Sequence, residues 1–196
     1  MPERLTHPDL PEDIVAAYGL LKPKKISGTP DVVENITGSR FVKKMSDRYM
    51  GITDLDIHTQ KYEKPKAFIK EEEISVSFSH TSDAISAAVS RYLVVGCDME
   101  MTGREVHPRL ASRMRHPGEK ESLYQNLEHI QIWTFKEAAL KCIGTGLRKP
   151  MKSVKIDQRE NSLFDVEFDG GRIAKICSFR HKEHWISICY HNKPLH

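Results

Sequence analysis

The sequence predicts an α+β fold in which antiparallel sheets pack against helices. Three observations predict it: strand patterns lie within residues 74–99, helical patterns follow within 108–143, and strand patterns return from residue 164. Strands, then helices, then strands, without strict βαβ alternation, favour antiparallel pairing. The length of 196 residues suits one domain or two small ones. The 39% hydrophobic and 29% charged fractions exclude a disordered or collagen-like chain.

The first 38 residues differ from the rest of the chain. They hold five of the ten prolines, so we expect an extended arm or cover with one short helix over residues 13–21, ended by Pro23. A second helix is expected from Ser39, because Phe41, Val42, Met45 and Tyr49 follow a helical period up to Gly51.

The middle and end of the chain supply the remaining predicted elements. Apolar residues alternate with serines over 74–79, which indicates a half-buried strand. Two more strands are expected to continue it as a meander that turns at Arg91-Tyr92. The predicted ranges are strands over 84–90 and 93–99, helices over 108–116, 118–126 and 130–143, and strands over 164–168, 173–179 and 185–190.

Charge, hydropathy and cysteine usage restrict the class of protein. The net charge of +3 is mild, so it permits an anionic partner without requiring one. No apolar run reaches the ~18 to 20 residues of a membrane span, and no secretory signal follows Met1. The four cysteines form no C-x-x-C pair, which indicates buried free thiols. We therefore expect a cytoplasmic protein without a membrane partner or a zinc site.

A pair of carboxylates marks the end of an apolar strand. In Val95-Gly96-Cys97-Asp98-Met99-Glu100, the positions of Asp98 and Glu100 are two apart and share one face of the strand. Adjacent carboxylates repel, and hard oxygen ligands suit Mg²⁺. Taken alone, the pattern more often represents a solvated strand end.

A second pattern lies on the predicted helix over 130–143. Trp133, Glu137 and Lys141 are spaced i, i+4, i+8 and form one stripe. Glu137 and Lys141 alone could be a surface ion pair that stabilises by ~0.3–0.5 kcal/mol. An aromatic residue beside the two ions favours the edge of a cleft. Ser79-His80, at the end of the first strand, could donate to a phosphate or simply end a turn.

Together these patterns resemble the 4′-phosphopantetheinyl transferases. Two motifs account for the resemblance: G-x-D-x-E, and W-T-F-K-E-A-A-L-K, which begins 35 residues after Asp98. Ser79-His80, which precedes both motifs, resembles the surfactin-synthetase-activating type of the family. The resemblance implies a pseudo-two-fold arrangement of two subdomains. We expect the arm over 1–38, a shortened first subdomain with its link over 39–92, and the second subdomain, which bears both motifs, over 93–196.

The resemblance also implies an activity and its metal. Such enzymes move the 4′-phosphopantetheine arm of coenzyme A onto a serine of an apo acyl, peptidyl or aryl carrier protein and release adenosine 3′,5′-bisphosphate. By this resemblance Asp98, Glu100 and Glu137 bind Mg²⁺, with Mn²⁺ as the alternative, and Glu119 is a further acidic residue near the metal. Glu137 is also the general base for the serine hydroxyl, directly or through a water.

The remaining implied contacts involve coenzyme A and the carrier protein. Lys141 is expected on the pyrophosphate with Lys136 nearby, and Trp133 on the pocket wall. The other expected cofactor contacts are Ser79 and His80 to phosphates, Lys64 and Pro65 on the adenine side (with Glu63 where the family has glycine), and Arg40, Lys43 and Lys44 to the 3′-phosphate. An acidic helix of the carrier protein could meet Arg104, Arg109, Arg113 and Arg115, although a solvated basic helix explains these arginines equally well. We expect a monomer.

Two other classes of protein remain open. The short N-terminal part suggests a non-catalytic module of the same fold that binds coenzyme A or a carrier protein. The basic balance suggests a nucleic-acid-binding protein, but the basic stretches lack interleaved aromatic residues, so we expect no nucleic acid partner.

Overall fold

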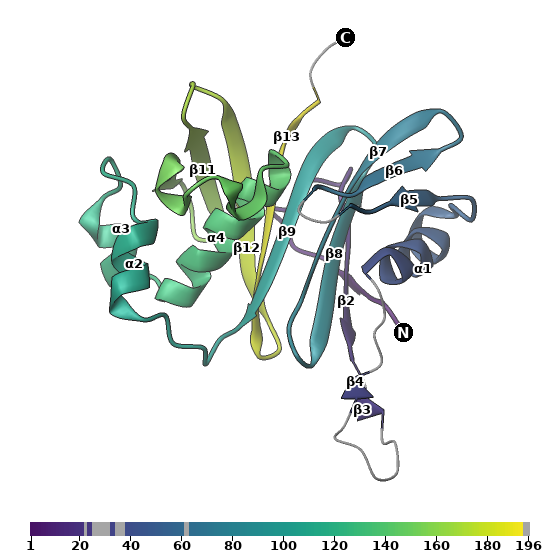
Figure 1. Cartoon of the computed structure of the whole chain (residues 1–196), viewed down its shortest axis with the longest axis horizontal. Coiled ribbons are helices and arrows are strands. Elements are labelled where there is room, and N and C mark those ends of the chain that lie inside the picture. Colours follow the sequence, from purple (N-terminus) through teal and green to yellow (C-terminus); the bar gives the residue numbers. More distant parts are fainter. Residues whose placement is uncertain (22, 25–31, 34–37, 61–62, 194–196) are drawn as a thin grey trace.

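The computed structural model describes residues 1–21, 23–24, 32–33, 38–60 and 63–193. It contains two antiparallel sheets that meet face to face, with α1 outside one sheet and α2, α3 and α4 outside the other (Figure 1). This arrangement confirms the predicted α+β class with two sheet-and-helix subdomains. The part of the predicted arm within 22, 25–31 and 34–37 lies outside the described residues.

The first sheet has six strands in the order β1-β2-β8-β7-β6-β5. Helix α1 (Gly38–Met50) packs on it through Phe41, Val42 and Met45. A separate short pair joins β3 (Pro23–Lys24) to β4 (Val32–Val33). The strand bounds are β1 Glu3–Leu5, β2 Val15–Leu20, β5 Asp56–His58, β6 Lys66–Ile69, β7 Glu72–His80 and β8 Ala84–Ser90.

The second sheet has five strands in the order β10-β11-β12-β13-β9. Its outer face is covered by α4 (His129–Cys142), beside which lie α2 (Pro108–Met114) and α3 (Glu121–Asn126). Two 3₁₀ turns, η1 (Gly146–Arg148) and η2 (Met151–Ser153), lead from α4 to β10. The strand bounds are β9 Leu93–Met101, β10 Val154–Gln158, β11 Leu163–Phe168, β12 Ile173–His181 and β13 His184–Asn192.

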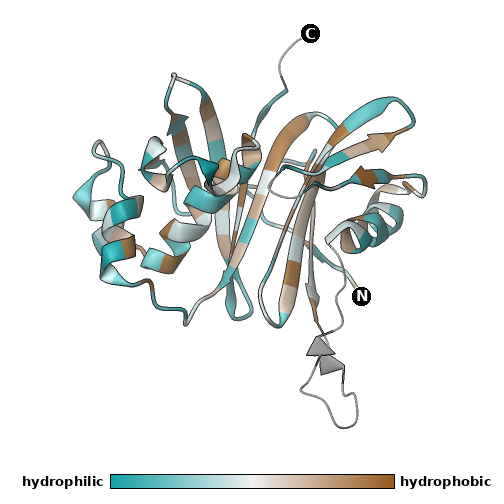
Figure 2. Cartoon of the chain, viewed as in Figure 1, coloured by the Kyte–Doolittle hydropathy of each residue, from teal (hydrophilic) through white to brown (hydrophobic). Residues whose placement is uncertain are grey.

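Apolar side chains form three clusters in these layers. One lies between α1 and the six-stranded sheet, one lies between the two sheets, and one lies between α4 and the outer face of the five-stranded sheet. Apolar residues run along the strands, whereas α1 presents a hydrophilic outer face (Figure 2). Both sheets are therefore buried on both faces, which explains why several strands read as continuous apolar runs.

The helix predicted over residues 13–21 is wrong, because β2 occupies this segment as an interior strand between β1 and β8. Val15 and Ala17 point toward the cluster under α1, whereas Ala16 and Tyr18 point toward the cluster between the sheets. An alanine-rich run buried on both faces cannot be distinguished from a helix by periodicity. The described N-terminal residues thus contribute strands to the first sheet.

The two sheets are joined by a row of serines on β7. Ser75 and Ser77 accept hydrogen bonds from the backbone N–H groups of Val95 and Cys97 at 2.9 Å each, and Ser79 donates to the Asp98 carboxylate at 2.8 Å. Because β9 is the edge strand of its sheet, these hydroxyls satisfy an edge that would otherwise lie open. The predicted alternation over 74–79 is confirmed, but its serine face is a junction and not a solvated surface.

The predicted meander is correct for β7 and β8 and wrong for β9. Strand β8 pairs with β7 and β2, whereas β9 pairs with β13, so the chain changes sheets at Arg91-Tyr92. The predicted boundary between the subdomains, at residues 92 and 93, coincides with this change, and the division into 1–38, 39–92 and 93–196 stays a prediction.

Other expectations are confirmed. The helices predicted from Ser39 and over 108–116 and 130–143 form, and the one over 118–126 is shortened to α3. The four cysteines are free and buried. Among the described residues no helix is long and apolar enough to cross a membrane.

Candidate active site

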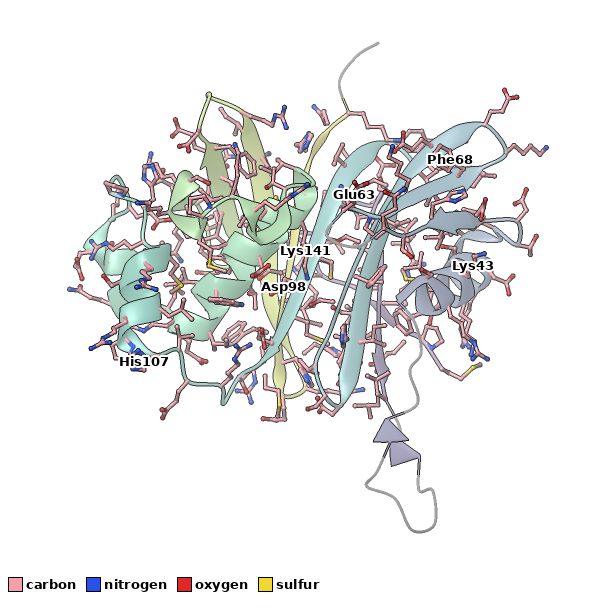
Figure 3. The ribbon with its side chains drawn as sticks, in the orientation of Figure 1. Lys43, Glu63, Phe68, Asp98, His107 and Lys141 are labelled. Atoms are coloured by element: carbon pink, nitrogen blue, oxygen red, sulfur yellow. The ribbon has the colours of Figure 1, made fainter. Side chains whose placement is uncertain are left out.

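The two motifs meet where α4 crosses β9. Gly96 has no side chain at the crossing, so the backbone of α4 approaches the strand closely. This approach brings Glu137 and Lys141 on α4 beside Asp98 on β9. Asp98 and Lys141 lie near the centre of the molecule (Figure 3).

Asp98 is the most buried carboxylate of the group and is 4% exposed. Its Oδ1 accepts hydrogen bonds from Ser79 Oγ at 2.8 Å and from Lys141 Nζ at 2.7 Å. Its Oδ2 is buried and has no hydrogen-bond partner within the described part of the chain. An unpaired buried carboxylate oxygen is costly, so this atom is explained best by a ligand that it binds.

Glu137 and Glu100 lie beside Asp98. Burial raises the pKa of Glu137 to about 7, and the negative charges of Asp98 and Glu100 contribute to the rise. Glu137 therefore exchanges a proton near neutral pH. Glu100 accepts a hydrogen bond from Arg104, whose guanidinium also lies 5.7 Å from the centroid of the Trp133 ring.

Lys141 is held against Asp98 and the Cys97 carbonyl oxygen, to which it donates at 3.2 Å. Burial lowers its pKa, but the Asp98 carboxylate outweighs this effect and raises the pKa overall. The ammonium group therefore stays charged and is available to a polyanion.

The chemical type of the carboxylate ligands suits a magnesium ion. Asp98, Glu100 and Glu137 offer the hard oxygen donors that Mg²⁺ takes, and Asp98 Oδ2 is buried without a partner. Across the described ranges, however, no three His, Cys, Asp or Glu side chains stand close enough together to hold an ion. Lys141 is paired with Asp98, and Arg104 is paired with Glu100.

Glu119 and Lys136 are placed with each other and not with these carboxylates. Both side chains are fully buried and form an ion pair. Glu119 also accepts from the backbone N–H groups of His116 and Ile156 at 2.8 Å, and Lys136 donates to the Val154 carbonyl oxygen at 2.5 Å. Binding a metal or a pyrophosphate would require either group to leave this pair, so the expected ligand contacts find no support in the geometry.

A cavity of about 740 Å³ adjoins the site. Its lining includes Lys64, Pro65, Phe78, Lys141 and Arg148, so it lies between the two subdomains beside the end of α4. The structure thus brings the predicted residues Lys64, Pro65 and Lys141 to one cavity of a size suited to a small-molecule ligand.

The ammonium group of Lys64 forms hydrogen bonds within the protein. Its Nζ donates to the Val95 carbonyl oxygen at 2.8 Å and to the Cys142 carbonyl oxygen at 3.0 Å, and burial lowers its pKa. The lysine therefore fastens the first subdomain to β9 and α4, and its alkyl stem forms part of the cavity wall. This connection was not apparent from the sequence, because both acceptors are backbone groups.

Ser79 and His80 lie at the end of β7, but they face different surroundings. Ser79 is buried against Asp98, whereas His80 is exposed and lines a second cavity of about 530 Å³ together with Glu100 and Arg104. Ser79 thus orients a carboxylate, a role that the sequence motif did not reveal.

Apart from Arg104, the basic residues expected to bind the 3′-phosphate or the carrier protein lie on outer helices or at their ends. Arg40, Lys43 and Lys44 are exposed on α1, and Lys43 is well separated from Asp98 in Figure 3. Arg115 pairs with Glu121 and covers the Tyr124 ring. On α2, Arg109 and Arg113 are exposed beside the partly exposed Leu110.

Comparison with known proteins agrees with this architecture. Residues 94–189, which run from β9 through β13, match the sequence model of the 4′-phosphopantetheinyl transferase superfamily. The matched residues make up just under half of the chain and carry both motifs of the candidate site. It is similar, at 26% identity over 136 residues, to 4′-phosphopantetheinyl transferase gsp of Aneurinibacillus migulanus. The alignment covers 66% of this chain and 56% of that relative, so the chain spans little more than half of the curated protein it matches.

Proposed function

We propose that the protein transfers the 4′-phosphopantetheine arm of coenzyme A to a serine of an apo carrier protein, with Mg²⁺ as cofactor, and releases adenosine 3′,5′-bisphosphate. The observation that carries the proposal is the buried Oδ2 of Asp98, which has no hydrogen-bond partner among the described residues. Lys141 pairs with the same carboxylate, and Glu137 lies near enough to Asp98 and Glu100 for their charges to raise its pKa. The match of residues 94–189 to the 4′-phosphopantetheinyl transferase superfamily supports the same reaction class.

Coenzyme A would lie in the cavity between the subdomains. Lys141 reaches from the cavity wall to the carboxylates, so the pyrophosphate would lie between the cavity and Asp98. Pro65 and the stem of Lys64 would contact the adenine side, and exposed His80 would donate to a phosphate. Bound Mg²⁺, held by Asp98, Glu100 and Glu137, supplies neutralisation of the pyrophosphate charge.

Glu137 would remove the proton from the carrier serine. A free serine hydroxyl is a weak nucleophile, and a carboxylate whose pKa is about 7 can accept its proton at neutral pH. The serine oxygen forms a bond to the phosphorus nearer the pantetheine, and the bond from that phosphorus to the bridging oxygen breaks. The leaving group is adenosine 3′,5′-bisphosphate, whose developing charge Lys141 would stabilise.

Intact-protein mass spectrometry tests the proposal. Incubation with coenzyme A, Mg²⁺ and a panel of apo acyl, peptidyl and aryl carrier proteins should raise the mass of at least one carrier by one phosphopantetheine arm. Glu137→Gln should abolish the transfer while the protein remains folded. No mass change with any carrier, accompanied by binding of coenzyme A in calorimetry, would favour the non-catalytic binding module.

A further inference from the structure

Arg104 is the cation that the chain itself places on one of the three carboxylates. It follows β9 in a turn in which its N–H donates to the Met101 carbonyl oxygen at 3.1 Å. Its guanidinium pairs with Glu100, which lies four residues earlier, and covers the ring of Trp133, which lies one helical turn before Glu137. Arg104 therefore connects the strand and the helix that supply the site.

The position of Arg104 leaves its side chain room to move. Half of the side chain is exposed, whereas the side chain of Glu100 is only 17% exposed. Arg104 also lines two cavities, the one beside His80 and another of about 400 Å³ beside His129 and Ile130. A guanidinium released from Glu100 would still have the Trp133 ring as a partner, because cation–π contact does not require the carboxylate.

Arg104 and a bound cation would compete for Glu100, because both are attracted to its negative charge. Asp98, Glu100 and Glu137 carry up to three negative charges, and Lys141 and Arg104 offset two of them. A carboxylate oxygen that accepts from a guanidinium is not free to ligate an ion. A divalent cation that needs Glu100 must take it from Arg104.

We propose that Arg104 is an internal counter-ion for Glu100 and weakens the binding of a divalent cation by competing for that carboxylate. This inference rests on the proposed function. In this view Arg104 is a positioning residue: it keeps Glu100 oriented before metal binding and then yields the carboxylate.

Binding of Mn²⁺, measured by electron paramagnetic resonance as the loss of the free-ion signal, tests the inference without turnover. Arg104→Gln should lower the Kd for Mn²⁺ about two- to fivefold, the range that a half-exposed ion pair supplies. Arg109→Gln, which removes an exposed arginine of α2, is the matched control and should leave the Kd unchanged.

The Glu100→Gln background separates competition from a general effect of charge. If Arg104 acts through Glu100, adding Arg104→Gln to Glu100→Gln should give no further gain in affinity. An unchanged Kd in Arg104→Gln, an equal gain in Arg109→Gln, or a gain that persists without Glu100 would each overturn the inference. Normal Mn²⁺ binding without transfer to any carrier would contradict the proposed function alone, because the Kd comparison does not depend on turnover.

Discussion

A Cβ atom at Gly96 would lie 2.1 Å from the carbonyl oxygen of Ala138 and 2.4 Å from the backbone nitrogen of Cys142. The glycine of the first motif and the helix of the second are therefore parts of one contact. The glycine is required by the close approach of two backbones, and this approach holds Glu137 and Lys141 beside Asp98.

Gly96→Ala is expected to destabilise the protein by about 1–3 kcal/mol or more, because backbone atoms, unlike a flexible side chain, cannot move aside. The fraction of the variant that folds should bind coenzyme A poorly and transfer the phosphopantetheine arm poorly, because α4 must shift away from β9. Urea unfolding measures the loss. Gly103→Ala is the control, because a Cβ atom there meets nothing within 4 Å. Equal stability of the two variants would contradict the close-approach explanation.

The sequence predicted the elements whose apolar residues recur on one side. Helix α1 and strand β7 each carry their apolar side chains on one side, and both were predicted from this spacing. Strand β2 was assigned to a helix because its burial on both faces is a property of the assembled sheets. The short strands β5 and β6 have too few residues to show a period.

The candidate site shows a similar limit. Local spacing indicated Asp98, Glu100, Glu137 and Lys141, and the structure brings them together. The partners of Glu119 were not predictable, because Lys136 and the Ile156 N–H are distant in sequence and come together only through packing. Lys64 likewise binds backbone carbonyl oxygens, which no residue pattern reports.

The serine junction between the sheets predicts a difference among serine variants. Ser77→Ala should lower the free energy of unfolding by about 1–3 kcal/mol, because it leaves the buried N–H of Cys97 without an acceptor. Ser46 is the matched control, since its hydroxyl is buried without a hydrogen-bond partner among the described residues. Ser46→Ala should therefore be neutral or stabilising in urea unfolding. A Ser77→Ala variant as stable as the wild type would show that the hydroxyl does not join the sheets.

The buried pair of Glu119 and Lys136 predicts a loss of stability and not a loss of ligand affinity. Lys136→Met should destabilise the protein by about 3–5 kcal/mol, because it leaves a buried carboxylate without its cation. The KM for coenzyme A of the folded fraction should stay near that of the wild type. Lys155→Met, which breaks surface pairs with Asp157 and Glu167, should cost far less. A raised KM with unchanged stability would instead place Lys136 on the pyrophosphate.

The pKa of Glu137 predicts how the stability of the metal-free protein depends on pH. The group titrates at 4.5 without its surroundings and at about 7 in the folded chain, mainly because of burial. Between these values the folded state binds more protons than the unfolded state, so the free energy of unfolding should fall as the pH rises from 4.5 to 7 and change no further above 7. The contribution of this group is about 3 kcal/mol.

Urea unfolding in the presence of a chelator, at pH 5 and at pH 8, measures this contribution as a difference between variants. The side chain of Glu137→Gln cannot ionise. Once the effect of the other titrating groups, which both proteins share, is subtracted, the variant should have a similar free energy of unfolding at both pH values. At pH 8 it should be more stable than the wild type. Glu105→Gln, which changes an exposed carboxylate, should follow the wild type at both values. The prediction fails if the wild type loses no more stability than Glu137→Gln between pH 5 and 8. The pKa of Glu137 would then have its ordinary value, and another residue would have to be the general base with a pKa near neutrality.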